Sequence, residues 1–221
     1  MSHIADEPIM MGIKTAIGHI MEEIGKATLV AVSKKRSVIS IKEAYSTGIR
    51  DFGESYLQEA LPKIEALKDL DITWHFIGNL QKNKVKKVVE HFDVIQSVNS
   101  IALAEEIDKR AEENKKIMDV MVEIYLGDED PKTGAALDDA RQIIDRIKEL
   151  ANIKLIGIMM MTPSIDIEKR RKYFREAKMF YDDIGLRFLS MGMTSDYKIA
   201  IEEGSNMVRI GTAIFGERNQ T

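Results

Sequence analysis

Apolar residues recur along this chain with two different spacings, and the alternation of the two predicts the fold. Near the N-terminus they recur every three or four residues, which places them on one face of a helix that Gly25 is suited to end. The residues of this face are Ile9, Ile13, Ala16, Ile17, Ile20 and Ile24. After this helix, short apolar runs alternate with amphipathic helical segments as far as the C-terminus. That alternation is typical of βα units.

Eight of the short runs are predicted to be strands. They are Thr28–Ser33, Arg50–Gly53, Ile72–Ile77, Val94–Val98, Asp119–Tyr125, Lys154–Met160, Leu186–Ser190 and Met207–Ile210. The segments between them are long enough for helices, and several runs are continuously apolar, as parallel strands buried on both faces should be. Eight such strands favour closure into a (β/α)8 TIM barrel, although an open doubly wound sheet shares the local pattern. The expected fold class is therefore α/β, with one barrel domain over residues 1–221 and an extra N-terminal helix.

The charge balance argues against a nucleic-acid-binding protein. The 221 residues carry a net charge of −4, whereas binding to a phosphate backbone needs a basic surface. A brief basic run at Lys82, Lys84, Lys86 and Lys87 is interleaved with valines at helical spacing, which indicates the solvated face of a helix. We therefore expect no nucleic-acid partner.

The sequence also lacks the residue types and segments that disulfide-bonded, metal-binding, membrane and secreted proteins need. It contains no cysteine, which removes disulfides, thiolate catalysis and cysteine-based metal sites, and its histidines do not have the spacing of metal ligands. No apolar stretch reaches the roughly 18 residues needed to cross a bilayer, and the N-terminal segment has no signal-peptide pattern. We expect a cytoplasmic protein with no bound metal and no membrane association.

Two loops after the last two predicted strands have the composition of an anion site. In barrels of this type the loops after strands seven and eight commonly hold phosphate groups. The loops read Ser190-Met191-Gly192-Met193-Thr194-Ser195-Asp196 and Arg209-Ile210-Gly211-Thr212. Glycine allows close approach of the backbone, and hydroxyl groups can donate to an anion. Either loop alone is better explained as a helix cap, but the two together favour a phosphate site.

Lys34 follows a strand of apolar and small residues, so we expect its side chain at the mouth of the barrel. Lysines at strand ends are usually solvated, as we expect for Lys35. A partly desolvated lysine, however, has a lowered pKa and becomes a nucleophilic amine that can form a Schiff base with an aldehyde. A phosphate site beside such a lysine points to pyridoxal 5′-phosphate.

His75 lies in the polar and aromatic segment Trp74–Gln81, at the end of the third predicted strand. A single histidine in an apolar strand is more often a hydrogen-bonded core residue than a catalytic one. Because the segment opens toward the functional face of the barrel, we keep His75 as a candidate cofactor-binding residue.

Six motifs make the chain similar to a known family. They are Ala31-Val32-Ser33-Lys34, Phe52-Gly53-Glu54, Tyr56 with Gln58-Glu59, Trp74-His75-Phe76-Ile77-Gly78 with Leu80-Gln81 and Asn83-Lys84, Ser190-Met191-Gly192-Met193, and Met207-Val208-Arg209-Ile210-Gly211-Thr212. In type and order these motifs resemble the YggS/PROSC family of pyridoxal phosphate homeostasis proteins, from about Leu29 to Arg218.

The resemblance implies a barrel similar to the N-terminal domain of bacterial alanine racemase, with pyridoxal 5′-phosphate bound as a Schiff base to Lys34. It also implies that Arg209 lies near the pyridine nitrogen, where a cation disfavours protonation of the ring and weakens it as an electron sink. The complete set of expected cofactor-binding residues is Lys34, Ser55, His75, Ser190, Met193, Thr194, Ser195, Arg209, Gly211 and Thr212.

By the same resemblance, Gly211 and Thr212 would hold the phosphate mainly through backbone N–H groups, and Thr194 and Ser195 through their hydroxyl groups as well. The chain departs from the family at two positions. Ser55 replaces a common asparagine and lacks its reach and paired donors, which weakens the expected contact to the ring. Thr194 replaces a common serine but keeps the hydroxyl donor.

The resemblance implies a carrier that buffers the cofactor and passes it to other enzymes, without catalysis. A competing function is that of an amino-acid racemase, which needs a base on each face of the substrate carbon, and residues 216–221 are too few to form the additional domain that supplies the second base in alanine racemase. Two other functions also stay open: a barrel that binds a phosphorylated metabolite without a Schiff base, and a structural interaction module.

We expect a monomer, with pyridoxal phosphate-dependent apoenzymes as candidate partners. The charged loop Asp128–Lys132 is a candidate lid or docking site.

Overall fold

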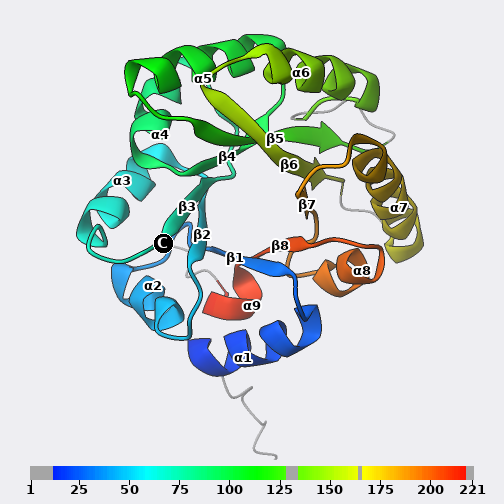
Figure 1. Ribbon diagram of the computed structural model, residues 1–221. Coiled ribbons are helices and arrows are strands. Elements are labelled where there is room, and N and C mark those ends of the chain that lie inside the picture. Colours follow the sequence, from blue (N-terminus) through cyan, green and yellow to red (C-terminus); the bar gives the residue numbers. More distant parts are fainter. Residues whose placement is uncertain (1–11, 128–133, 164–165, 218–221) are drawn as a thin grey trace, which may run out of the picture.

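The chain forms a closed parallel barrel. A computed structural model describes residues 12–127, 134–163 and 166–217. Within these residues, eight strands pair in sequential order and the last strand pairs with the first (Figure 1). The predicted (β/α)8 fold is confirmed, and the closed order excludes the open doubly wound sheet.

All eight predicted strands are present. They are β1 (Thr28–Val32), β2 (Asp51–Glu54), β3 (Thr73–Phe76), β4 (Val94–Val98), β5 (Met118–Tyr125), β6 (Ile153–Met161), β7 (Phe188–Ser190) and β8 (Met207–Ile210). Their ends differ from the predicted ones by at most two residues, and the largest difference is at the start of β7. There, the Asn206 side chain accepts the Leu189 N–H at 2.7 Å and donates to the Arg187 carbonyl at 2.9 Å. A side chain thus takes the hydrogen bonds that a longer strand would make with its neighbour.

Helices surround the strands. They are α1 (Ile13–Ile24), α2 (Val38–Tyr45), α3 (Leu57–Ala66), the 3-10 turn η1 (Lys82–Lys84), α4 (Val85–His91), α5 (Ile101–Glu113), α6 (Leu137–Glu149), α7 (Ile167–Ile184), α8 (Tyr197–Glu202) and α9 (Thr212–Phe215). The predicted basic helix face is confirmed for Lys86 and Lys87 on α4, whereas Lys82 and Lys84 lie in the preceding turn η1. Val85, Val88 and Val89 are fully buried, whereas Lys86 and Lys87 are exposed.

The extra N-terminal helix completes the outer ring. Helix α1 lies between α2 and α8, and it contacts both (Figure 1). It ends at Gly25, which has φ +60° and donates its N–H to the Met21 carbonyl, as the sequence predicts. The buried residues of its apolar face are Ala16, Ile17, Ile20 and Ile24, while Ile9 lies outside the described residues. Because α9 after β8 has only four residues, α1 covers this side of the barrel.

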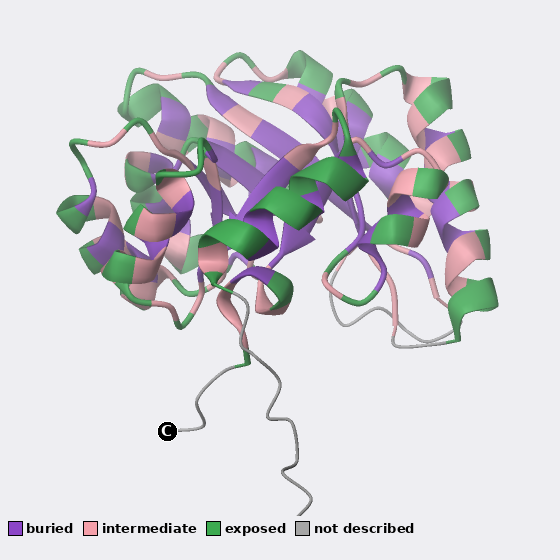
Figure 2. Ribbon diagram, turned by 90° about the horizontal axis from the view of Figure 1, so that it is seen from below, coloured by how far each residue is buried: buried purple, intermediate pink, exposed green. Residues whose placement is uncertain are grey.

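The core has two regions. A large cluster joins the outer faces of the strands to the helices, whose buried residues lie on the side nearer the strands and whose exposed residues lie on the outer side (Figure 2). A small cluster consists of strand residues alone and fills the inside of the barrel. Its buried members are Val30, Val94, Met121, Ile156, Met159 and Met207. Buried polar residues on the strands, among them Gln96 and Glu123, share the interior with these apolar residues.

No helix in the described part of the chain is both long enough and apolar enough to span a membrane. The candidate lid Asp128–Lys132 lies outside the described residues.

Two isoleucines of α2 test the packing of the outer layer. Ile41 is fully buried, whereas Ile39 on the same helix is 78% exposed. Substitution Ile41→Ala should lower the free energy of unfolding by about 2–5 kcal/mol, because it removes buried methylene groups and leaves a cavity. Ile39→Ala is the matched control and should change it by less than about 0.5 kcal/mol. Urea denaturation followed by circular dichroism measures both, and equal effects would contradict the difference in burial.

Candidate functional site

A cavity of about 390 Å³ opens at the carboxyl ends of the strands, the end at which barrels of this type place their functional sites. It is lined by Val32, Lys34, Ser55, Ile77, Met161, Met193, Thr194, Ser195, Arg209, Gly211 and Thr212. These residues come from β1, β6 and β8 and from the segments that follow β1, β2, β3, β7 and β8. The volume lies within the range of about 300–1,000 Å³ typical of small-molecule pockets.

Lys34 reaches this cavity from a tight turn after β1. The turn is closed by a hydrogen bond of 3.0 Å from the Arg36 N–H to the Ser33 carbonyl. Lys35 inside the turn has φ +60°, the left-handed region that residues other than glycine rarely adopt. Ser33 itself is fully buried, and its N–H donates to the Gly53 carbonyl at 2.9 Å. The backbone before Lys34 is therefore tied to the adjacent strand.

The loops after β7 and β8 meet at the cavity beside the Lys34 turn, since β8 pairs with β1. The Met193 N–H donates to Oδ1 of Asp196 at 2.6 Å, and the Ala213 N–H reaches Oγ1 of Thr194 at 3.4 Å. Gly192 has φ +97°, and a Cβ atom there would lie 2.6 Å from the Cβ of Ala200. Only glycine fits that position. The loop is thereby folded so that residues 193–195 line the cavity.

Ser55 reaches the cavity because the backbone after β3 lies against it. A Cβ atom on Gly78 would lie 2.2 Å from the Ser55 carbonyl oxygen and 2.8 Å from its Cα. Such distances are far below van der Waals contact, so glycine at position 78 is required for this approach.

Arg209 is the buried cation of the site and is 4% exposed. Its guanidinium donates to the carbonyl of Ser190 at 2.7 Å, to the hydroxyl of Ser190 at 2.8 Å and to the carbonyl of Met160 at 3.0 Å. Burial lowers the pKa of Arg209 to about 10, and the charges of Glu123 and Asp196 oppose that shift. The group therefore remains a cation at neutral pH.

A chain of hydrogen bonds runs from Arg209 through the interior of the barrel. The Ser190 hydroxyl, which accepts from Arg209, donates to Oε1 of Gln96 at 2.8 Å. The Gln96 amide nitrogen lies 2.9 Å from Nδ1 of His75, and Nε2 of His75 lies 2.9 Å from Oδ1 of Asp51. Since an amide NH₂ can only donate and a carboxylate can only accept, His75 carries its proton on Nε2.

Eight of the ten residues singled out in the sequence line the cavity. The remaining two are His75 and Ser190, which lie inside the barrel and reach Arg209 through the hydrogen bonds just described. Gln96, which joins those two, was not found by sequence reasoning, although a glutamine in the apolar strand Val94–Val98 was a usable signal. The apolar lining residues Val32, Ile77 and Met161 were also missed, since apolar strand ends do not stand out in such a sequence.

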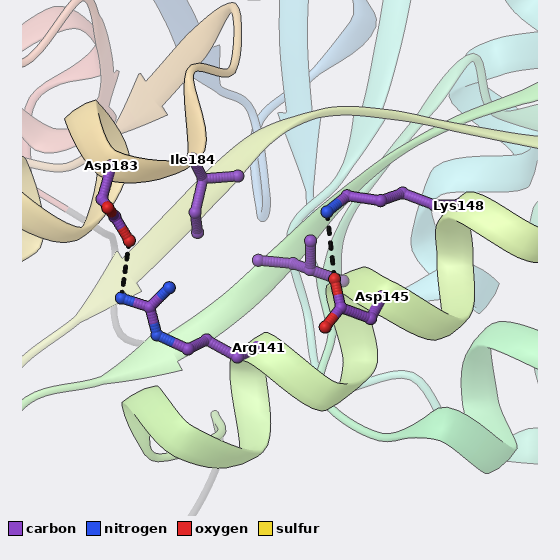
Figure 3. A pocket seen from close by; sticks show the side chains of 6 residues that line it. Arg141, Asp145, Lys148, Asp183 and Ile184 are labelled. Carbon is purple, nitrogen blue, oxygen red and sulfur yellow. Dashed lines mark hydrogen bonds and ion pairs between the residues drawn. The ribbon is translucent and has the colours of Figure 1, made fainter.

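A second hollow, of about 180 Å³, lies on the outside of the barrel between α6 and α7 (Figure 3). Its charged side chains pair with one another: Arg141 with Asp183 at 2.7 Å, and Lys148 with Asp145 at 3.0 Å. All four are at least half exposed. Because each cation already faces a carboxylate, this hollow is poorly suited to an anionic ligand.

Known proteins share the fold of this chain. The family model of the alanine racemase N-terminal domain matches residues 10–219. Among solved structures, alanine racemase from Clostridium difficile 630 has 14% sequence identity and a TM-score of 0.78, covering 95% of this chain and 60% of that one, so it shares the fold.

More similar proteins are matched over most of their own length. The pyridoxal phosphate homeostasis protein of Aquifex aeolicus is 42% identical over 199 residues, 87% of each chain, and that of Escherichia coli K12 is 36% identical over 214 residues, 93% of this chain and 90% of the relative. The structure of PipY from Synechococcus elongatus PCC7942 with PLP bound has 36% identity and a TM-score of 0.86, covering 92% of this chain and all of that one. The chain belongs to the pyridoxal phosphate homeostasis protein family.

The interior chain of hydrogen bonds can be tested with a pair of glutamine variants. Gln96→Leu should lower the free energy of unfolding by about 1–3 kcal/mol for each buried hydrogen bond that it removes, because the Ser190 hydroxyl loses its acceptor and Nδ1 of His75 loses its donor. Gln81→Leu, at an exposed position, should leave it within about 0.5 kcal/mol. Urea denaturation gives both values, and a Gln96→Leu protein as stable as wild type would rule out the described network.

Proposed function

We propose that this protein binds pyridoxal 5′-phosphate as a Schiff base on Lys34 and acts in cofactor homeostasis as a carrier or buffer. The observation that carries the proposal is that Lys34 and Arg209 line the same cavity. The loops that bear Thr194, Ser195, Gly211 and Thr212 line it as well. The names of the relatives and the PLP bound in PipY support the same conclusion.

The residues present fit such a ligand in charge and in shape. The phosphate would be held by Thr194, Ser195, Gly211 and Thr212, which come from two adjacent loops. Gly211 gives the backbone room, because its missing Cβ would lie 3.3 Å from the Val32 carbonyl. Ser55 and Met193 would contact the remainder of the ligand from the segments after β2 and β7. His75 and Ser190 would act indirectly, through Arg209.

The bound cofactor supplies an aldehyde that condenses with a primary amine and loses water. In this chain Lys34 supplies the amine from a fixed turn, while the loops after β7 and β8 orient the phosphate. Arg209 would place a permanent cation near the pyridine nitrogen and so keep the ring unprotonated, which limits its power to stabilise a carbanion. The site would bind the cofactor without activating it strongly.

The same site argues for a carrier rather than a racemase. Racemisation needs an acid or base on each face of the substrate carbon. Among the described residues that line the cavity, the ionisable side chains are those of Lys34 and Arg209, and Arg209 does not release its proton at neutral pH. We propose that the protein has no robust catalytic activity of its own.

We extend the proposal to the organisation of the protein. Residues 1–221 would form a single domain, supported by the closure of the barrel between β1 and β8 and by α1 in its outer ring. The protein would work as a cytoplasmic monomer and deliver the cofactor to apoenzymes that depend on it. Gel filtration and pull-down with such apoenzymes test these statements directly.

The first test of the function is covalent trapping on Lys34. Purified protein mixed with pyridoxal 5′-phosphate should develop an absorbance band at about 420 nm. Borohydride should then reduce the adduct and fix it on Lys34, which peptide mapping can show. Lys34→Ala should abolish the band and keep the fold. Lys82→Ala, at an exposed lysine, is the control and should keep both band and fold. A label spread over surface lysines would instead favour a barrel that binds phosphorylated metabolites without a covalent bond.

The second test concerns Arg209. Arg209→Ala should shift the absorbance maximum of the bound cofactor, because the ring nitrogen loses its neighbouring cation and can be protonated. Arg209→Lys keeps the charge and should shift it less, although a lysine cannot make the same paired hydrogen bonds. Spectra recorded between pH 6 and 9 measure the effect. Identical spectra for wild type and Arg209→Ala would place the ring away from this residue.

A further inference from the structure

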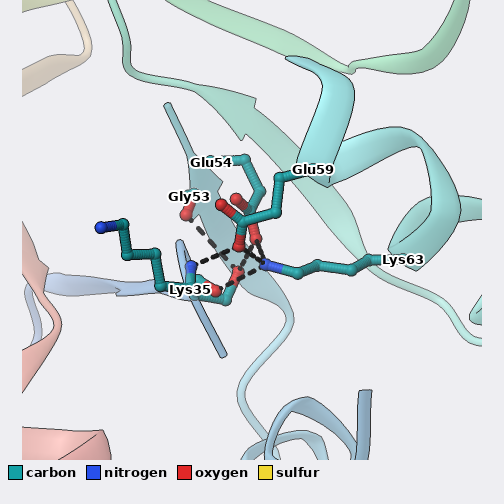
Figure 4. A network of polar contacts seen from close by, with 6 residues as sticks. Lys35, Gly53, Glu54, Glu59 and Lys63 are labelled. Carbon is teal, nitrogen blue, oxygen red and sulfur yellow. Dashed lines mark hydrogen bonds and ion pairs between the residues drawn. The ribbon is translucent and has the colours of Figure 1, made fainter. Parts of the chain in front are cut away.

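A buried ionic cluster lies directly beneath the turn that presents Lys34. It consists of Lys63 and Glu59 on α3 and Glu54 at the end of β2 (Figure 4). The Lys63 ammonium lies 2.8 Å from Oε1 of Glu54 and 2.5 Å from Oε1 of Glu59. Lys63 is 7% exposed and Glu54 is fully buried. None of the three lines the cavity, so the cluster makes no direct contact with a ligand there.

The cluster holds the turn on both sides of Lys34. Before Lys34, the Lys63 ammonium donates to the Ser33 carbonyl at 2.8 Å, and the Ser33 hydroxyl donates to Oε1 of Glu54 at 2.7 Å. After Lys34, the Lys35 N–H donates to Oε1 of Glu59. The Lys35 side chain itself points away from the cluster (Figure 4). The contacts thus fix the backbone of the turn rather than the side chains that leave it.

Two features show that the cluster is costly to maintain. Lys35 is held with φ +60°, a region that a residue with a Cβ atom adopts at a cost in conformational energy. Oε2 of Glu54 is buried without a hydrogen-bond partner among the described residues, and burial raises the pKa of Glu54 against the opposing effect of Lys63 and Ser33. Buried ion pairs add little to stability compared with apolar residues of the same size. Stability alone does not account for this arrangement.

We propose that Lys63, Glu54 and Glu59 are positioning residues that hold the turn after β1 so that the Lys34 amine points into the cavity. The inference rests on the proposed function, in which that amine bonds to the cofactor. Without Lys63 or Glu59, Lys35 would relax out of the left-handed region and the amine would move away from its place. A displacement of about 1 Å in a reacting group can slow a reaction by up to about 100-fold.

The experiment measures the rate at which pyridoxal 5′-phosphate bonds to Lys34, by stopped-flow absorbance with borohydride trapping. Lys63→Met should slow this step by about 10- to 100-fold. The matched control is Lys116→Met, because Lys116 is a partly buried lysine that, like Lys63, donates to the backbone, here to the carbonyl groups of Val89 and Phe92 at 2.9 Å each. It lies just before β5, at the opposite end of the barrel, and its variant should react at the wild-type rate.

Further measurements separate positioning from a loss of fold or of phosphate binding. Inorganic phosphate should compete with pyridoxal 5′-phosphate for the site, and its inhibition constant should rise by no more than about twofold in Lys63→Met. The reason is that the phosphate loops do not contact the cluster. Glu59→Ala removes the acceptor of the Lys35 N–H at a partly exposed position, and it provides the same test if Lys63→Met does not fold. Lys35→Gly in the Lys63→Met background should restore most of the rate, because glycine adopts the left-handed region without the cluster.

The outcomes distinguish the inference from the function on which it rests. If wild-type protein forms no adduct on Lys34, the proposed function fails and the positioning role fails with it. If wild type reacts and both Lys63→Met and Glu59→Ala react equally fast, the positioning role is overturned while the proposed function stands. If the variants are slow but Lys35→Gly restores nothing, the turn is not what the cluster controls, and the inference is likewise overturned.

Discussion

The pairing of β1 with β8 is the contact on which the site depends. It aligns Val30 with Arg209 and Ala31 with Ile210, so residues from the two ends of the chain become neighbours on one ladder. The turn with Lys34 and the loop with Gly211 then leave the barrel side by side, because parallel strands end at the same edge. The other strand pairs join strands that are consecutive in the sequence. The pairing of β1 with β8 joins the first strand to the last and so closes the barrel. An open sheet would leave the amine and the guanidinium at opposite edges.

Burying Arg209 inside the barrel places strict demands on its neighbours. A buried cation is tolerated only when its donors find acceptors, and here backbone carbonyls and the Ser190 hydroxyl supply them. Ser190 must then donate onward to Gln96, which in turn fixes the tautomer of His75. The interior of the barrel is therefore a set of polar groups with fixed directions, surrounded by the methionines and valines of the small apolar cluster. The directions of the Ser190 hydroxyl and the Gln96 amide follow from the buried guanidinium of Arg209.

Local patterns in the sequence carry most of the fold but only part of the site. Apolar runs and helical periodicity define every strand and α1, because burial imposes these patterns on each element separately. Eight of the cavity-lining residues stand at strand ends or in glycine- and hydroxyl-rich loops and can be found in the same way. Gln96 does stand out as a glutamine in an apolar strand, but its role and those of Lys63 and Glu54 cannot be found in this way, since they arise from contacts between different elements. Lys63 in particular reads as one more charged residue on an amphipathic helix, and only the packing of α3 against the turn shows that it is buried.

The two polar networks also restrict which strand registers the barrel can adopt. A shift of one residue in β8 would turn Arg209 from the interior into the apolar layer between strands and helices, where its acceptors would be lost. A corresponding shift in β2 would carry Glu54 into the interior and leave the Lys63 ammonium and the Ser33 hydroxyl without an acceptor. Buried polar groups add little to net stability when they are satisfied, but they penalise heavily each arrangement that leaves them unpaired. The same contacts that place the amine and the guanidinium at the cavity therefore select the register of the strands that carry them.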